Sequence, residues 1–291
     1  MSKFAIAALQ LELESKDNID LLCQEIRIVR KRFPWVDMVV LAELASFGTG
    51  LKHAQTMPGT AEQSFCTLAK ETGLWILPGS LYEKKDDKVF NTAPVINPAG
   101  EVVTRCRKMF PFLPYETGVT SGEEFTVFNI NGVGCFGVSI CYDMWFPETT
   151  RTLVSMGAEV ILHPSLTNTL DRDAELAIAR SSAVTNQCYF FDINSAGKLA
   201  FGRSIIAGPG GEIIHQAGAG REIIPIEIDL EYVRRVRTQG WHNLAQPLKS
   251  FRDHKTPFPI YQNHNNSSAL TELGPLAMAK KANTNKDNKS Q

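Results

Sequence analysis

The stretch Gly137-Val138-Ser139-Ile140-Cys141-Tyr142-Asp143-Met144-Trp145-Phe146-Pro147-Glu148 joins an apolar run to a predicted helix. Pro147 stands where a helix would begin, because its fixed φ suits the first turn, and Gly157 suits the helix end, so we predict a helix over residues 147–156. The Cys141 thiol would then lie between a strand end and a helix start, where free N–H groups favour a thiolate or an oxyanion. The alternative is a small hydrophobic residue buried in a strand, and this stretch alone favours neither.

Strands and helices alternate in two successive groups. In the first group we predict strands at residues 4–11, 38–43, 75–81, 89–97 and 101–106, and helices at 15–32 and 60–72. In the second we predict a hairpin of residues 127–130 and 133–140 around Asn131-Gly132, strands at 158–162, 188–193, 204–207, 212–215 and 223–228, and helices at 147–156 and 171–186. This order predicts an α/β protein with a pair of mixed sheets covered by helices.

The composition excludes several classes of protein. With 291 residues, of which 43% are hydrophobic, the chain is long and apolar enough for a full α/β core. A net charge of −1 without a basic patch argues against a nucleic-acid partner, and no apolar run is long enough to cross a membrane. The start of the chain is interrupted by polar residues and is predicted to be a strand, not a signal peptide. Six scattered cysteines without a CxxC pair indicate reduced thiols in a cytoplasmic protein, and neither a disulfide framework nor a zinc site.

The end of the chain changes in composition. We predict a domain over residues 1–262, including a C-terminal arm at about 238–262, and a disordered or loosely docked tail at 263–291, which is rich in Asn, Lys, Ala and Ser. The arm carries large apolar side chains beyond the last core strand, so it is expected to cover a partner subunit, with docking on its own subunit as the alternative. These side chains are Trp241, Leu244, Leu248, Phe251, Phe258 and Tyr261.

Two further stretches carry candidate chemistry. Glu43 ends a buried-type strand, and partial desolvation between Leu41 and Leu44 would raise its pKa as a general base requires; the alternative is a solvated carboxylate at the rim. Lys108 also ends a strand, and a proline-stiffened loop then leads to Glu116. A lysine beside two carboxylates stays charged and can stabilise an oxyanion, although a solvated lysine is the more ordinary role.

The histidines do not point to a serine-hydrolase triad. His163, before Pro164, is interpreted as structural, and His215 and His242 have no serine or aspartate pattern around them.

Taken together, Glu43, Lys108 and Cys141 resemble the Glu–Lys–Cys triad of the nitrilase superfamily, the carbon–nitrogen hydrolases. The resemblance covers roughly residues 4–237 and includes weaker matches at Asn91-Thr92, Phe146-Pro147-Glu148, Gly157-Ala158, Ala179-Arg180, Asn186, Asn194-Ser195-Ala196-Gly197, Gly202-Arg203-Ser204 and Gly208-Pro209-Gly210-Gly211. The loop from Lys108 to Glu116 and the Cys-Tyr-Asp sequence are similar to the amidase branches. The chain departs from the family at Leu170-Asp171-Arg172-Asp173, where a tryptophan is common, and at Thr185, where a glutamate is frequent.

The resemblance implies a four-layer α-β-β-α sandwich of the nitrilase type, dimers of two sandwiches, and no metal or organic cofactor. It also implies acyl transfer: Glu43 as base, Cys141 as nucleophile, Lys108 and the Tyr142 N–H around the oxyanion, and Glu116 beside the substrate nitrogen. The expected function is a cysteine-dependent amidohydrolase acting on a small carboxamide. The alternatives are a nitrilase or N-carbamoyl amine hydrolase with the same triad, and an inactive binding or assembly subunit on the same fold.

The substrate pocket is expected to be small and to favour neutral amides. No Arg or Lys other than Lys108 falls inside its segments, so an acidic substrate would leave a charge unpaired unless Arg172 or Arg203 reached in. The predicted lining residues are Phe47, Phe112, Tyr115, Tyr142, Trp145, Leu166 and Thr167.

Overall fold

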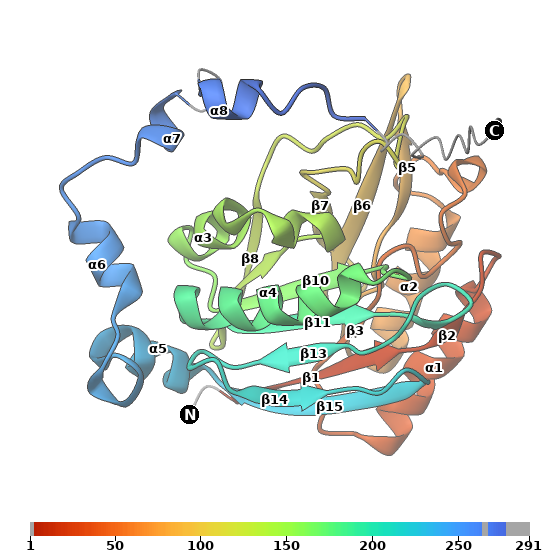
Figure 1. Cartoon of the computed structure of the whole chain (residues 1–291). Helices are drawn as coiled ribbons and strands as arrows, with labels where there is room; N and C mark the ends of the chain where they lie inside the picture. The colour runs from red at the N-terminus through yellow and green to blue at the C-terminus, as the bar shows by residue number, and fades with distance from the viewer. Residues whose placement is uncertain (1–2, 264–266, 278–291) are drawn as a thin grey trace, which may run out of the picture.

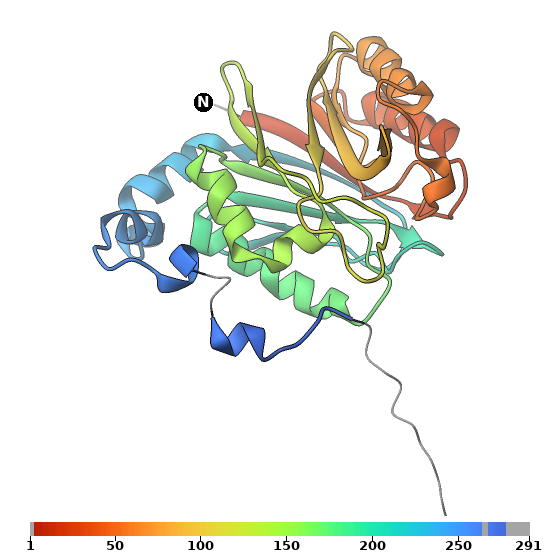
Figure 2. The same cartoon turned by 90° about the horizontal axis from the view of Figure 1, so that it is seen from above.

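Two β-sheets lie face to face in a computed structural model that describes residues 3–263 and 267–277 (Figures 1 and 2). The first sheet runs in the order β15-β1-β3-β4-β6-β5, with β7 also paired to β6, and β1, β3 and β4 are parallel. Its strands are β1 (Lys3–Gln10), β3 (Met38–Leu41), β4 (Trp75–Leu77), β5 (Leu81–Lys85), β6 (Lys88–Ile96), β7 (Val102–Arg107) and β15 (Glu222–Asp229).

The second sheet runs in the order β14-β13-β11-β10-β9-β8, and β9, β10 and β11 are parallel. Its strands are β8 (Thr126–Ile130), β9 (Gly134–Val138), β10 (Val160–Ser165), β11 (Tyr189–Asn194), β13 (Ile205–Ala207) and β14 (Ile213–Gln216). A short pair, β2 (Glu12–Leu13) with β12 (Ala196–Gly197), links the two halves of the sequence.

Helices cover the outer face of each sheet. Leu22 and Ile26 of α1 (Ile19–Arg32) and Phe65 of α2 (Thr60–Thr72) share a core with the first sheet. Helices α3 (Pro147–Ser155) and α4 (Asp171–Asn186) pack on the second sheet. A third core lies between the sheets and takes side chains from both. The predicted four-layer α-β-β-α architecture is therefore confirmed.

Local signals in the sequence placed many of these elements. The helices predicted over 60–72 and 171–186 have those bounds, and Gly73 closes the first in the left-handed region at φ 66°. The predicted hairpin is β8–β9, and Gly132 in its turn has φ 76°.

Other expectations were wrong at element boundaries. Helix α1 begins at Ile19, because the Asn18 side chain bonds the carbonyls of Glu14 and Ala45 and holds the preceding chain in a loop. The strand predicted over 75–81 stops at Leu77, because Gly79 at φ 74° turns the chain where its backbone meets the Ala42 carbonyl. Helix α5 (Leu230–Gln239), with Asp229 capping it, was not predicted.

Beyond α5 the arm follows the outside of the sandwich (Figure 1). The arm carries the short helices η3 (Trp241–Asn243), α6 (Pro247–Asp253) and α7 (Pro259–Asn263). A further short helix, α8 (Ser268–Thr271), follows it. Of the tail predicted to be disordered, residues 264–266 and 278–291 lie outside the described residues, and α8 falls in the remainder. In the described part of the chain, every helix is too short or too polar to span a membrane.

Candidate active site

Three chain segments that follow strands meet at one cavity. Glu43 comes two residues after β3, Lys108 directly follows β7, and Cys141 begins the short 3-10 helix η2 (Cys141–Trp145) after β9. All three side chains line a cavity of about 750 Å³. Strands β3 and β7 belong to the first sheet and β9 to the second, so the packing of the two sheets brings these three residues, distant in sequence, to one cavity.

The backbone at Cys141 is held in an unusual conformation by the residues around it. Cys141 has φ 48°, a value rare for a residue with a side chain, so its surroundings must impose it. The buried Asp143 carboxylate accepts the N–H groups of Ile140 at 2.9 Å and of Phe110 at 2.8 Å, which ties this turn to the loop after Lys108. Asp143 therefore couples two segments of the site.

His163 supports the same turn. Its Nε2 lies 3.1 Å from the Cys141 carbonyl oxygen, which can only accept, so Nε2 carries the hydrogen and Nδ1 accepts from the Ser139 hydroxyl at 2.7 Å. Burial lowers the pKa of His163 to about 4, so the ring is neutral at pH 7. His163 supports the backbone at Cys141, in keeping with its interpretation as structural.

Lys108 lies between two carboxylates. Its Nζ is 2.8 Å from Glu43 Oε1 and 2.7 Å from Glu116 Oε2, and the Lys108 side chain is only 2% exposed. Burial works to lower the pKa of Lys108, but the charges of Glu43 and Glu116 raise it well above its ordinary value. A permanent cation thus lies beside the thiol.

Burial shifts the pKa values of both Glu43 and Cys141 upward. Burial raises the pKa of Glu43, although the Lys108 charge opposes the shift, and the direction matches the expectation from the sequence. Burial, followed by the charge of Glu43, raises the pKa of Cys141 well above its ordinary value. These surroundings therefore favour the protonated thiol of Cys141.

Glu116 is held by more donors than Lys108 alone. The Phe112 N–H donates to Glu116 Oε2 at 2.6 Å, and the Tyr82 hydroxyl and Asn91 Nδ2 approach Oε1 at 3.5 and 3.4 Å. Asn91 Nδ2 also donates to Glu43 Oε1 at 2.8 Å. The sequence marked Asn91 only as a weak family match within a predicted strand, and it did not single out Tyr82, which follows the strand predicted over residues 75–81.

The predicted lining residues gather at the cavity, with one exception. Phe112, Tyr115, Tyr142, Trp145, Leu166 and Thr167 all line it. Phe47 does not: the chain turns at Leu44, with φ 50°, and Phe47 packs with Ala61 of α2 and Leu81. With a volume of about 750 Å³ the cavity is also larger than the small pocket expected from five aromatic side chains.

The sequence did not single out two acidic side chains at this cavity. Glu175, 4% exposed, and Asp171 both come from the start of α4. Arg172 and Arg203, the two arginines considered as partners for an acidic substrate, do not line the cavity and are paired with carboxylates. Arg172 is buried against Glu175 and Asp192, and Arg203 pairs with Asp173 at 2.7 Å.

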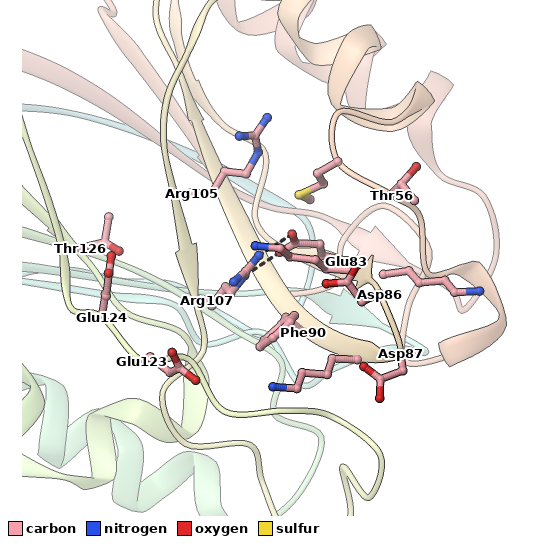
Figure 3. Close-up of a pocket in the computed structure, with 14 residues that line it drawn as sticks. Thr56, Glu83, Asp86, Asp87, Phe90, Arg105, Arg107, Glu123, Glu124 and Thr126 are labelled. Atoms are coloured by element: carbon pink, nitrogen blue, oxygen red, sulfur yellow. Dashed lines mark hydrogen bonds and ion pairs between the residues drawn. The ribbon is translucent and has the colours of Figure 1, made fainter.

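A second hollow, of about 950 Å³, lies over β5, β6 and β7 (Figure 3). Its charges largely neutralise each other: Arg107 pairs with Glu83 at 2.6 Å and stacks on the Phe90 ring, and Arg105 pairs with Glu62 at 2.8 Å. No cysteine is among its lining residues. The smaller cavity, with its thiol, base and cation, is therefore the candidate active site.

Comparison with known proteins agrees with this geometry. The sequence profile of the family described as Carbon-nitrogen hydrolase matches residues 5–238. The chain is 30% identical over 258 residues to omega-amidase NIT2 of Danio rerio and 28% identical over 260 residues to that of Homo sapiens, each covering 82% of this chain and 93% of the relative.

Solved structures show the same likeness. Nit3 of Saccharomyces cerevisiae, a member of branch 10 of the nitrilase superfamily, has a TM-score of 0.75 at 30% identity, over 81% of this chain and 94% of that one. A carbon-nitrogen hydrolase from Helicobacter pylori has a TM-score of 0.79 at 24% identity, over 91% and 99% of the two chains, which speaks for the fold alone.

Proposed function

The chain belongs to the carbon–nitrogen hydrolase family, and from that premise we propose that it is an amidase that converts a carboxamide into a carboxylic acid and ammonia through a thioester on Cys141. The observation that carries the proposal is the placement of Lys108 Nζ within 2.8 Å of Glu43 and 2.7 Å of Glu116, at a cavity that the Cys141 thiol also lines. A base, a cation and a nucleophile in one water-poor site are what acyl transfer needs.

In the first half-reaction, Glu43 takes the proton from Cys141 Sγ as the sulfur attacks the amide carbon. The C=O π electrons move to oxygen, and the resulting oxyanion is stabilised by Lys108 Nζ and by the Tyr142 N–H at the start of η2. When the oxyanion collapses, the C–N bond breaks, Glu43 returns the proton to the nitrogen, and ammonia leaves. The raised pKa of Glu43 makes it a competent donor in this step.

In the second half-reaction, water attacks the thioester and gives its proton to Glu43. The tetrahedral intermediate expels the sulfur, which recovers a proton from Glu43, and the carboxylic acid leaves. Glu116 has a supporting role in both halves: it holds Lys108 in place and offers a carboxylate oxygen to the substrate N–H.

The charges at the cavity argue against an acidic substrate. Among the described residues that line it, Lys108 is the only cation, and the carboxylates Glu43 and Glu116 already share it. A substrate carboxylate would enter without a partner, which is costly in a partly buried site. We therefore expect butanamide to be hydrolysed faster than succinamate.

The test is ammonia release by the full chain from a panel of amides, nitriles and N-carbamoyl amines, with Cys141→Ala as the blank. Mass spectrometry of acid-quenched enzyme should detect an acyl group on Cys141 during amide turnover. Turnover of nitriles or N-carbamoyl compounds without amides would replace the proposal by one of its alternatives, and no turnover at all would favour a binding or assembly subunit.

We further propose that the chain self-associates through its arm. Helix α6 docks on its own subunit, because Leu248 packs with the core of α3 and α4. Beyond it, Phe258 and Tyr261 remain 43% and 54% exposed, and Phe258 packs mainly against Phe251 of the same arm. A second copy would bury this surface. A monomeric mass by light scattering at micromolar concentration would contradict the proposal.

A further inference from the structure

Glu175 is a buried carboxylate at the wall of the active-site cavity. It lies in α4, lines the cavity together with Cys141, and is 4% exposed. The Thr167 hydroxyl donates to its Oε1 at 3.0 Å, and Trp145 Nε1 approaches the same oxygen at 3.5 Å. None of the catalytic steps proposed above uses it.

Glu175 shares its cationic partner, Arg172, with a second carboxylate, Asp192. Arg172 Nη1 lies 3.1 Å from Glu175 Oε2 and 2.7 Å from Asp192 Oδ2, and the Arg172 and Asp192 side chains are at most 1% exposed. His163 lies near this group, but burial lowers its pKa to about 4, so it adds no charge at pH 7. One guanidinium therefore serves two carboxylates, which leaves one negative charge beside the cavity.

The other described residues that line the cavity do not balance the negative charge of the Glu175 cluster. Its described lining residues include four carboxylates, Glu43, Glu116, Asp171 and Glu175, against the single cation Lys108. Burial, and next the charge of Asp192, raise the pKa of Glu175. Burial and the charge of Asp192 therefore make the Glu175 carboxylate costly, and a cation in the cavity would offset that cost.

Aromatic side chains stand beside this carboxylate. Trp145 and Tyr142 have ring centroids 6.2 Å apart, and Phe112 packs against Tyr142 at 4.9 Å. Their faces can attract a cation through the ring quadrupole, most strongly for tryptophan. A carboxylate next to aromatic faces is a favourable environment for an ammonium or guanidinium group.

Resting on the proposed amidase function, we propose that the substrate is an amide whose far end carries a positive charge, and that Glu175 is the residue that selects it. Lys108 then meets the reacting end of the substrate, where negative charge develops, and Glu175 meets the other end. The cavity that the Cys141 thiol lines has a volume of about 750 Å³, which is large enough for an acyl group of more than two carbons. Charge complementarity of this kind acts mainly on specificity.

The first test needs no variant. Ammonia release by the full chain is measured for two matched sets of primary amides: β-alaninamide, butanamide and succinamate, and 6-aminohexanamide, heptanamide and pimelic acid monoamide. Within each set only the far end changes, from ammonium to methyl to carboxylate. We expect the cationic amide of at least one set to exceed the neutral one by roughly ten- to a hundredfold in kcat/KM, the range for one hydrogen bond to a charged group.

The second test removes the charge and keeps the shape. Glu175→Gln retains an acceptor for Thr167 and leaves Arg172 paired with Asp192 alone, so we expect it to fold and the ratio of cationic to neutral kcat/KM to fall to about one. The matched control is Glu227→Gln, which removes the same charge from an exposed pair with Lys3 and should keep the wild-type ratio.

The outcomes separate this inference from the proposed function. Equal or faster turnover of the neutral or acidic amides in both sets would overturn the cationic substrate while the amidase remains. Retention of the cationic preference in Glu175→Gln would overturn the role of Glu175. Absence of ammonia from every amide would remove the amidase itself.

Discussion

Among the described residues, two buried cations each form ion pairs with two carboxylates. Lys108 follows β7 of the first sheet and contacts Glu43 and Glu116. Arg172 in α4 lies over the second sheet and contacts Glu175 and Asp192 of β11. In the first cluster the cation itself lines the cavity, whereas in the second a carboxylate lines it and the cation lies behind.

This difference shows why burial and ion pairing alone do not assign a role to a charged residue. Both clusters have one cation and two carboxylates, and in both the cation is at most 2% exposed. What a substrate meets is decided by which member faces the cavity: an ammonium group stabilises a developing oxyanion, and a carboxylate attracts a cation. Changes to the first cluster should therefore affect the chemical step, and changes to the second should affect the choice of substrate.

The largest effect is expected from the nucleophile beside the first cluster. Cys141→Ala should lower amide turnover by at least about four orders of magnitude, because no other group can form the thioester. Cys141→Ser should be nearly as inactive, since Glu43 is a weak base for a hydroxyl. Ammonia release and thermal unfolding are measured together, and the fold should be retained. Cys66→Ala, in α2, is the control and should stay close to wild type. Near wild-type turnover by Cys141→Ala would show that the first cluster is not the catalytic one.

The next prediction sets the two cations against each other. Lys108→Met and Arg172→Met each leave two buried carboxylates without a cation, so each should lower the free energy of unfolding by about 3–5 kcal/mol, measured in urea. Only Lys108→Met should also lower kcat for butanamide by a factor of about 10²–10³, since only Lys108 faces the reacting carbonyl.

The rates are compared below the temperature at which either variant unfolds. A similar loss of kcat in both variants would mean that the second cluster also acts on the chemistry, and the distinction between them would fail.

The sequence predicted the first cluster better than the second, for a physical reason. Glu43, Lys108 and Cys141 each follow a strand that stands out as an apolar or alternating run, and ligand sites in α/β proteins gather beyond the carboxyl ends of strands. That position marks each residue as a site candidate, whereas the stacking of β9 in one sheet against β3 and β7 in the other is known only from the fold. Their catalytic roles remain proposals.

Glu175 gave no comparable signal. It lies near the start of a helix that also carries the charged residues Asp171, Arg172 and Asp173, so from sequence a carboxylate there is read as part of a solvated face. Its partner Arg172 is also paired with Asp192, which comes close only after β11 pairs with β10. Phe47 shows the opposite failure: it is close to Glu43 in sequence, but the turn at Leu44 directs it to α2.

Asp143, a buried carboxylate outside both clusters, sharpens the comparison because it makes no ion pair with a described cation. Asp143 is bound by backbone N–H groups, and burial raises its pKa to about 7. Below about pH 4 the folded and unfolded states both hold the proton on Asp143, whereas between about pH 4 and pH 7 only the folded state holds it. The stability of the wild type should therefore fall relative to Asp143→Asn as the pH rises through this window, by up to about 1.4 kcal/mol per pH unit.

Urea unfolding of both proteins from pH 4 to pH 8 measures this difference. A flat difference would mean that the backbone N–H groups stabilise the Asp143 carboxylate as effectively as a cation does.

The smallest effect is expected from Thr167, which acts on the second cluster alone. Its hydroxyl donates to Glu175 Oε1 at 3.0 Å and lowers the pKa of that carboxyl, while its backbone is held separately by Asn194, so Thr167→Val should keep the loop in place. Loss of one hydrogen bond to the ionised carboxylate should reduce kcat/KM for 6-aminohexanamide by roughly three- to tenfold, and that for heptanamide by much less. Thr67→Val, which removes an exposed hydroxyl on α2, is the matched control. An equal loss for both amides would show that Thr167 acts on the chemistry or the loop, and not on the charge that Glu175 presents to the cavity.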